Sequence, residues 1–157
     1  MRDERFKAEH RGGPLNLLNH RLLATWAADC AEHVLLLFDD AHPNDNRPRI
    51  AIKKARSWAR GEISVGEARE ASISAHKAAK KSNNLAAQFA ARSAGHAAAT
   101  AHMADHAPRS AMYAIKAIID PNNKENEVRS VEQEQKWQRD QLPDEIRDLV
   151  LSTLDIK

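Results

Sequence analysis

The chain has 157 residues, a length that suits one domain burying roughly 70% of the surface its unfolded form would expose. It carries 24 basic and 22 acidic residues, and a formal charge of only +2 excludes a strong overall attraction to nucleic acid or to an anionic membrane. Alanine supplies much of the 42% hydrophobic fraction and runs of Val, Ile or Thr are missing, so the composition disfavours a sheet and predicts an all-α fold.

The first residues form a polar segment. Residues 1–14 are charged and lack the apolar run of a signal peptide, so we expect a polar N-terminal arm followed by an all-helical domain over residues 15–157. No stretch approaches the roughly 20 apolar residues that cross a bilayer. The single cysteine, Cys30, cannot form an internal disulfide. These features predict a cytoplasmic protein with a buried, reduced thiol and no membrane contact.

The first predicted helix runs from Leu15 or Leu17 to about Asp39. Apolar residues recur there at three- and four-residue intervals, which places them on one helical face. These residues are Leu18, Leu22, Trp26, Cys30, Val34 and Leu37.

The next two helices have clear local signals. A second helix is expected from Arg47-Pro48, because proline is tolerated in a first turn, to Gly61, which suits a left-handed cap. Ser64 and Glu67 have the spacing of a capping box and predict the start of a third helix, which continues to about Lys81. Its packed face is expected to consist of Ala68, Ser72, Ala75 and Ala79.

The fourth predicted helix, from about Leu85 to Asp105, is rich in alanine and histidine. Alanine occupies 11 of the 22 positions from Ala86 to Ala107, so neighbouring helices can approach closely. A new helix is expected near Pro108, then a turn at 120–123, a charged helix and a last helix from Leu142-Pro143. We therefore predict a compact single-domain bundle of about seven helices around this central helix.

Histidines give the central region its candidate chemistry. His102 and His106 are four residues apart, so on one helix they share a face and could hold a metal ion. His96 lies about 240° around that helix from His102 and cannot complete the site without a second helix. His76 belongs to the preceding helix. We favour the interpretation that these histidines form hydrogen bonds across packed helices, with no metal or cofactor, and a metal site remains the alternative.

Two other groups are candidates. Asp29 and His33, four residues apart, could form an acid–imidazole pair, but catalysis would also need a nucleophile, and the thiol of Cys30 points about 100° away. Arg47 and Arg49 belong to a basic segment, residues 47–60, that could bind phosphate. Nearby glutamates and the lack of a glycine-rich phosphate loop favour a solvated helix face instead.

Several segments resemble the Imm-5 like putative immunity proteins. They are WAADCAEHVLLLF from Trp26, DNRPRIAIKKARSWARGEISVGEARE from Asp45, SAHKAAK from Ser74, AARSAGHAAATAHMADHAPRSAMYAIKA from Ala90 and EQKWQRDQLPDEIRDLV from Glu134. The resemblance covers the chain from about His20 to Val150. It implies a bacterial protein that binds a cognate toxin and blocks it without catalysis.

The resemblance also implies a set of recurring residues. Most of them suit helix caps, close packing or buried polar contacts; they are Arg47, Arg49, Trp58, Arg60, Gly61, Glu62, His76, Gly95, His96, Thr100, His102 and His106. Some relatives carry an exonuclease label, but the chain shows no carboxylate cluster that would position Mg²⁺. The toxin interface is therefore expected on the 41–46 loop, the charged helix after residue 123, or the N-terminal arm.

Three hypotheses follow. The leading one is an immunity protein whose partner is a toxin. The second is a helical enzyme or ligand-binding protein that uses the His/Asp cluster, and the third is a nucleic-acid-associated protein. The sequence leaves self-association open.

Overall fold

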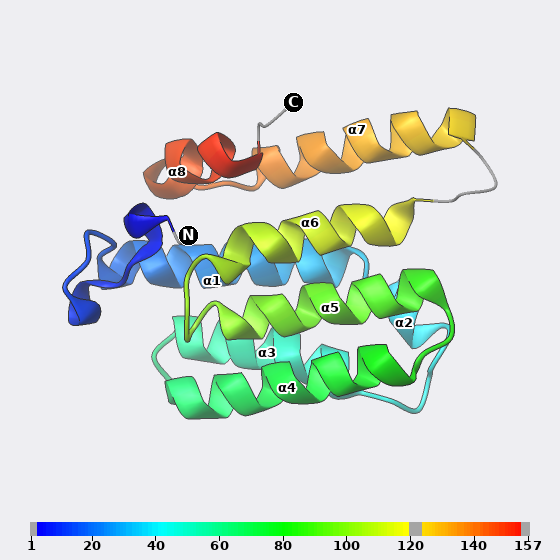
Figure 1. Ribbon diagram of the computed structural model, residues 1–157, viewed down its shortest axis with the longest axis horizontal. Coiled ribbons are helices and arrows are strands. Elements are labelled where there is room, and N and C mark those ends of the chain that lie inside the picture. Colours follow the sequence, from blue (N-terminus) through cyan, green and yellow to red (C-terminus); the bar gives the residue numbers. More distant parts are fainter. Residues whose placement is uncertain (1–2, 120–123, 155–157) are drawn as a thin grey trace.

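Helices form nearly all of the regular structure in a computed structural model of the chain (Figure 1). It describes residues 3–119 and 124–154, and for residues 124–129 only the course of the helix. The helices are α1 (Leu17–His33), α2 (Leu36–Asp39), α3 (Arg47–Ala59), α4 (Val65–Lys81), α5 (Leu85–Ala99), α6 (His106–Ile118), α7 (Lys124–Asp140) and α8 (Asp144–Leu154). The all-α prediction is confirmed, and the turn expected at 120–123 lies outside the described residues.

The first predicted helix is split in two. The backbone leaves helical geometry at Val34, where φ is −116° and ψ is 6°, so α1 ends at His33 and α2 follows as a short turn. The predicted apolar face is only partly buried: Leu18 is 63% exposed and Leu37 is 37% exposed. The buried face is rotated because alanines at positions 24, 27, 28 and 31 pack inward.

Local signals account for the starts of α3 and α4. Pro48 occupies the first turn of α3, and Gly61 follows that helix in the left-handed conformation with φ of 76°. The capping box of Ser64 and Glu67 forms as predicted, with the Glu67 N–H donating to Ser64 Oγ at 3.1 Å. The expected face of α4 is buried as well: it consists of Ala68, Ser72, Ala75 and Ala79.

The alanine-rich helix α5 lies at the centre of the bundle. It contacts α1, α2, α3, α4 and α6, as its row of buried alanines allows (Figure 1). It ends at Ala99, six residues earlier than the predicted Asp105. The Thr100 hydroxyl donates to the His96 carbonyl at 3.0 Å, and His20 of α1 donates from Nε2 to the Thr100 carbonyl at 2.7 Å. The bond from His20 satisfies a carbonyl that a longer helix would have used internally.

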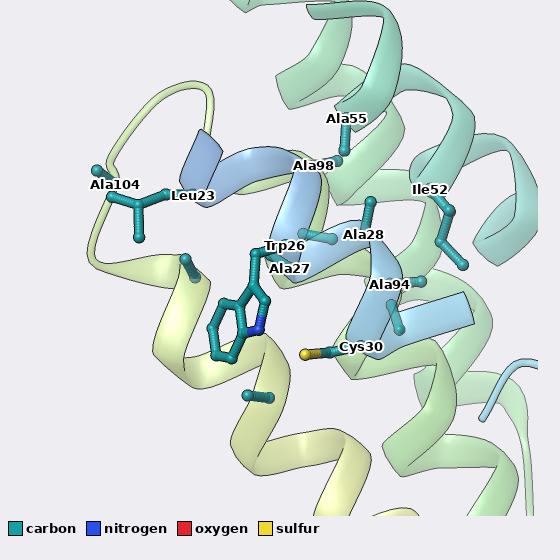
Figure 2. Packing of buried hydrophobic residues seen from close by; sticks show 14 of the residues in the cluster. Leu23, Trp26, Ala27, Ala28, Cys30, Ile52, Ala55, Ala94, Ala98 and Ala104 are labelled. Carbon is teal, nitrogen blue, oxygen red and sulfur yellow. The ribbon is translucent and has the colours of Figure 1, made fainter. Parts of the chain in front are cut away.

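The main core lies between α1, α3 and α5. Figure 2 shows α1 side chains such as Ala28 close to Ile52 and Ala55 of α3 and to Ala94 and Ala98 of α5. Trp26 is 1% exposed, and its indole N–H donates to the Gln138 carbonyl of α7 at 2.9 Å. The packing therefore ties α7 and α8, which lie beyond α6, to the central layer (Figure 1).

The described part of the N-terminal arm contributes to this core. Phe6 is 5% exposed, and the Leu15 N–H donates to the Lys7 carbonyl at 3.0 Å. Cys30 is fully buried, and burial raises the pKa of its thiol. Within the described residues, no helix has both the length and the apolar character needed to span a bilayer.

Candidate functional site

Three of the predicted histidines meet between three helices. His76 comes from α4, His96 from α5 and His106 from the start of α6. His96 Nδ1 and His106 Nδ1 are 2.8 Å apart, and the rings of His76 and His96 lie edge to face with centroids 5.0 Å apart. His96 therefore contacts histidines of two other helices. From the sequence alone, His96 could take part in a shared site only through such a contact.

Gly95 makes room for this arrangement. A β-carbon added at position 95 would lie 2.7 Å from His76 Nε2 and 2.8 Å from His76 Cε1. Such distances are well inside van der Waals contact, so glycine at this position lets the His76 imidazole pack closely against α5. The glycine among the alanines of α5 is thus explained by a side chain from the neighbouring helix.

Burial and nearby cations keep the central histidines neutral. Burial, with Arg92 and His106 nearby, lowers the pKa of His76 to about 4. Burial, with His106 and His76 nearby, lowers the pKa of His96 to about 3. At neutral pH both rings are uncharged, and bases this weak are poorly matched to proton abstraction. His76 Nδ1 accepts a hydrogen bond from Arg92 Nη1 at 2.8 Å, which leaves its Nε2 as the protonated nitrogen.

Aromatic and cationic side chains surround the three histidines. Tyr113 stacks on His96 with centroids 5.1 Å apart and an interplanar angle of 7°. Lys116 Nζ lies 5.1 Å from the Tyr113 ring centroid and 5.7 Å from that of Phe89. We call this surface of α4, α5 and α6 the basic-aromatic face. It consists of His76, Phe89, Arg92, His96, His106, Tyr113 and Lys116.

Sequence reasoning missed four members of this face, Phe89, Arg92, Tyr113 and Lys116, and two of them carry a clear positional signal. Arg92 lies four residues before His96 on α5, and Tyr113 lies seven residues after His106 on α6. Both spacings place the side chains on the faces that carry the histidines, so the helical period could have found them.

His102 lies apart from the three converging histidines. The expectation that His102 and His106 share one helical face is wrong, because α5 ends at Ala99 and His106 begins a different helix. His102 instead lines a cavity of about 350 Å³ beside Phe6 and Lys7 of the N-terminal arm. Among the described residues, no group of three or more His, Cys, Asp or Glu side chains is arranged to hold a metal ion.

Asp29 and His33 bind other partners. Asp29 Oδ1 accepts from Arg56 Nη1 at 2.9 Å, whereas His33 Nδ1 lies 2.7 Å from Glu134 Oε2. The His33 ring stacks on Trp137 of α7, with centroids 3.6 Å apart. The expected acid–imidazole pair is therefore replaced by contacts from α3 and α7, which compete for both groups.

Two hydroxyls of α5 and its C-terminal cap are engaged in hydrogen bonds within the bundle. Ser93 is fully buried and donates to the Ser110 carbonyl at 2.8 Å, and Thr100 donates to its own helix. Both hydroxyls stabilise the packing of α5.

The arginines of α3 are neutralised by carboxylates. Arg47 Nη2 lies 2.7 Å from Asp45 Oδ2, and Arg49 pairs with Asp39. Hydrogen bonds from Arg47 lower the pKa of Asp45. Asp45 thus braces the entry to α3 through Arg47. Arg56 and the adjacent Arg60 are paired too, which reduces the charge that this helix offers to phosphate.

A comparison with protein families shows the family of the chain. The family model described as "Imm-5 like putative immunity protein" matches residues 13–145. The chain belongs to this family. The match runs from just before α1 into the first turn of α8, so it includes all eight candidate residues. All residues of the basic-aromatic face lie within the matched region. No curated protein and no solved structure matches the chain.

Proposed function

We propose that the chain is an immunity protein that binds a cognate bacterial toxin in the cytoplasm of the producing cell and neutralises it without catalysis. Membership of the Imm-5 like family, over residues 13–145, is the observation that carries this proposal. In this role the protein needs a stable scaffold with a complementary surface rather than an active site.

The contacts of the polar candidates are consistent with a scaffold. Asp29, His33, Arg47 and Arg49 join α1, α3 and α7 or brace the start of a helix. The two central histidines are neutral and packed against Gly95 and Tyr113. These residues stabilise the fold, which leaves partner recognition to more exposed side chains.

The second candidate function is binding of a small ligand or metal by the converging histidines. The meeting of His76, His96 and His106 favours it. A metal bound at the Nδ1 atoms of His96 and His106 would have to displace the hydrogen bond between them, because one Nδ1 carries the proton and the other accepts it with its lone pair. Titration with Zn²⁺ followed by calorimetry distinguishes the two functions, because immunity requires no binding of this ion.

Growth protection tests the proposed function. Each protein encoded beside this gene is expressed in a sensitive host, alone and together with the chain. One neighbour is expected to stop growth and the chain to restore it, with full protection only at about equimolar expression, because a blocking protein is consumed by its complex. Absence of a toxic neighbour, absence of rescue, or rescue at a small fraction of the toxin level would contradict the proposal.

A further inference from the structure

A groove of about 750 Å³ runs between α6, α7 and the end of α8. Its floor is apolar and is formed by Ala111, Met112, Ile115, Leu151 and Leu154. Met112 is 41% exposed, on the side of α6 opposite to its buried alanines. We call this feature the α6 groove.

Three cations border the α6 groove. Arg109 and Lys116 lie on α6 and Arg139 lies on α7, and the described residues that line the groove include no carboxylate. Over the same described part of the chain, none of the three forms an ion pair. The arginines of α3, by contrast, are each paired. Three of the cations without an ion pair in the described part of the chain therefore lie beside an apolar surface.

The groove is continuous with the basic-aromatic face. Lys116 belongs to both, since it lines the groove and lies over the rings of Tyr113 and Phe89. Arg109 lies close enough to His96 to lower its pKa, and it too lines the groove. A partner seated in the groove would thus meet Arg109 and Lys116 on α6 and Arg139 on α7.

We propose that the α6 groove is the docking site for an acidic amphipathic helix of the toxin, with the apolar face of that helix on Met112 and Ile115 and its carboxylates on Arg109, Lys116 and Arg139. This inference rests on the proposed function. The groove follows α6 from Pro108 to Lys116, about 12 Å, which accommodates about two turns of a bound helix. Apolar anchors at helical spacing in such a groove, with charges around the rim, are a recurrent mode of peptide recognition.

The apolar floor favours a protein helix over nucleic acid. A phosphate backbone would gain favourable interactions only with the cations. Its charged groups would lose water against Met112, Ile115 and Leu151, and these apolar side chains offer no hydrogen bond in return. An amphipathic helix matches both parts of the groove at once. Its acidic face would also be drawn toward the uncompensated cations during encounter.

Peptide binding tests the inference without knowledge of the toxin. The probe is a fluorescein-labelled helix of about 15 residues, near the shortest length that is helical in water, with Leu on one face and Glu on the other. A twin peptide carries Lys in place of Glu. Fluorescence anisotropy measures the affinity of both for the full chain, and laurate and a single-stranded DNA oligonucleotide are measured as competitors.

Two charge-reversed variants are compared. Arg109→Glu with Arg139→Glu alters the groove, whereas Lys53→Glu with Lys77→Glu makes the same change in net charge at exposed positions of α3 and α4. The groove variant is expected to weaken binding of the acidic peptide at least about tenfold and the control to leave it nearly unchanged. Met112→Gln, which keeps the side-chain length but removes its apolar character, should weaken binding as well. Thermal unfolding checks that all variants are folded.

Other outcomes overturn the inference. These are no binding of the acidic peptide, equal loss in both charge-reversed variants, tighter binding of the Lys twin, or tighter binding of the oligonucleotide or laurate. If the charge-reversed groove variant and Met112→Gln still protected cells fully, the groove would not be the docking site, and the proposed function would stand. If the chain bound the acidic peptide at the groove but protected against no neighbouring protein, the proposed function would be wrong. The preference of the groove for an acidic helix would still hold.

Discussion

The packing of His76 on Gly95 shows how one missing β-carbon organises the basic-aromatic face. The imidazole occupies the space that any other residue at position 95 would fill. Arg92 holds the ring from one side and His96 meets it edge to face. Since both neighbours restrict the ring, it cannot move aside without breaking one of these contacts.

Substitution of Gly95 by alanine should therefore destabilise the protein. Alanine improves helix propensity by about 0.5–1 kcal/mol, but a clash in a packed site costs about 1–3 kcal/mol. We expect a net loss of about 1 kcal/mol and a melting temperature lower by about 3 °C.

The matched control is Gly66→Ala in α4. A β-carbon at position 66 meets only Ser64 Oγ, at 3.8 Å, so the propensity gain should appear there as a stabilisation of up to about 1 kcal/mol. Thermal unfolding of both variants measures the difference. Equal stabilisation by the two substitutions would show that His76 is not held against α5.

At the scale of the elements, Gln138 fastens α7 to the rest of the bundle. Its side chain is 2% exposed, and its Nε2 donates to the Ala111 carbonyl of α6 at 3.0 Å. Its own carbonyl accepts the indole N–H of Trp26 from α1. One residue thus joins three helices, and α8 follows α7 directly along the chain.

Replacement of Gln138 by leucine should loosen this attachment. Leucine has no amide to donate, so the Ala111 carbonyl on α6 loses one hydrogen bond. We expect the free energy of unfolding to fall by about 1–2 kcal/mol. Hydrogen exchange should rise in α7 and α8 before it rises in α3, α4 or α5. Gln133→Leu, at an exposed position of α7, should change stability by no more than about 0.5 kcal/mol. A uniform rise in exchange across all helices would contradict the special role of Gln138.

The helix starts could be predicted and one helix end could not. Pro48 and the capping box at Ser64 act within a few residues of the boundary, so the sequence carries the whole signal. The end of α5 depends in part on His20, which is 80 residues from Thr100 along the chain and binds its carbonyl. The spacing of the alanines alone therefore predicted a helix that continues to Asp105. Leucines likewise outweighed alanines in the prediction for α1, although the alanines form its buried face.

The candidate residues were found more readily than their partners. Histidines in an alanine-rich segment stand out by composition, but which faces meet depends on how the helices pack. His96 meets His106 only because α5 ends before residue 100 and α6 returns beside it. Asp29 and His33 share a helical face, yet Arg56 and Glu134 arrive from α3 and α7 and bind them separately.

For the whole molecule, the net charge of +2 conceals an uneven distribution. Carboxylates neutralise the arginines of α3, whereas cations on α5, α6 and α7 gather around neutral histidines and the α6 groove. The nearby positive charge contributes to the low pKa values of His76 and His96, after burial. The stability of the fold consequently depends on the protonation of His76 and His96, which the nearby cations oppose.

This link predicts that acid destabilises the fold. Histidines in the unfolded chain bind protons below about pH 6.5, whereas in the folded protein the pKa is about 4 for His76 and about 3 for His96. Their stabilising effect is therefore complete above pH 6.5 and is lost progressively as the pH falls toward 4 and 3. His20, whose pKa is also lowered by burial, acts in the same direction.

Between pH 7 and pH 5 we expect His76 and His96 together to lower the free energy of unfolding by about 2 kcal/mol, a value reduced for their partial contact with solvent. Urea denaturation at pH 7, 6 and 5 measures the loss. His96→Gln removes the ring with the lowest pKa, so the variant should be less stable than the wild type at pH 7 but lose less stability on acidification. Carboxylates with lowered pKa values, such as Asp45, contribute only in more acidic solution, so they do not obscure this range. A wild-type stability that stays constant from pH 7 to pH 5 would mean that these imidazoles are already open to protons in the folded protein.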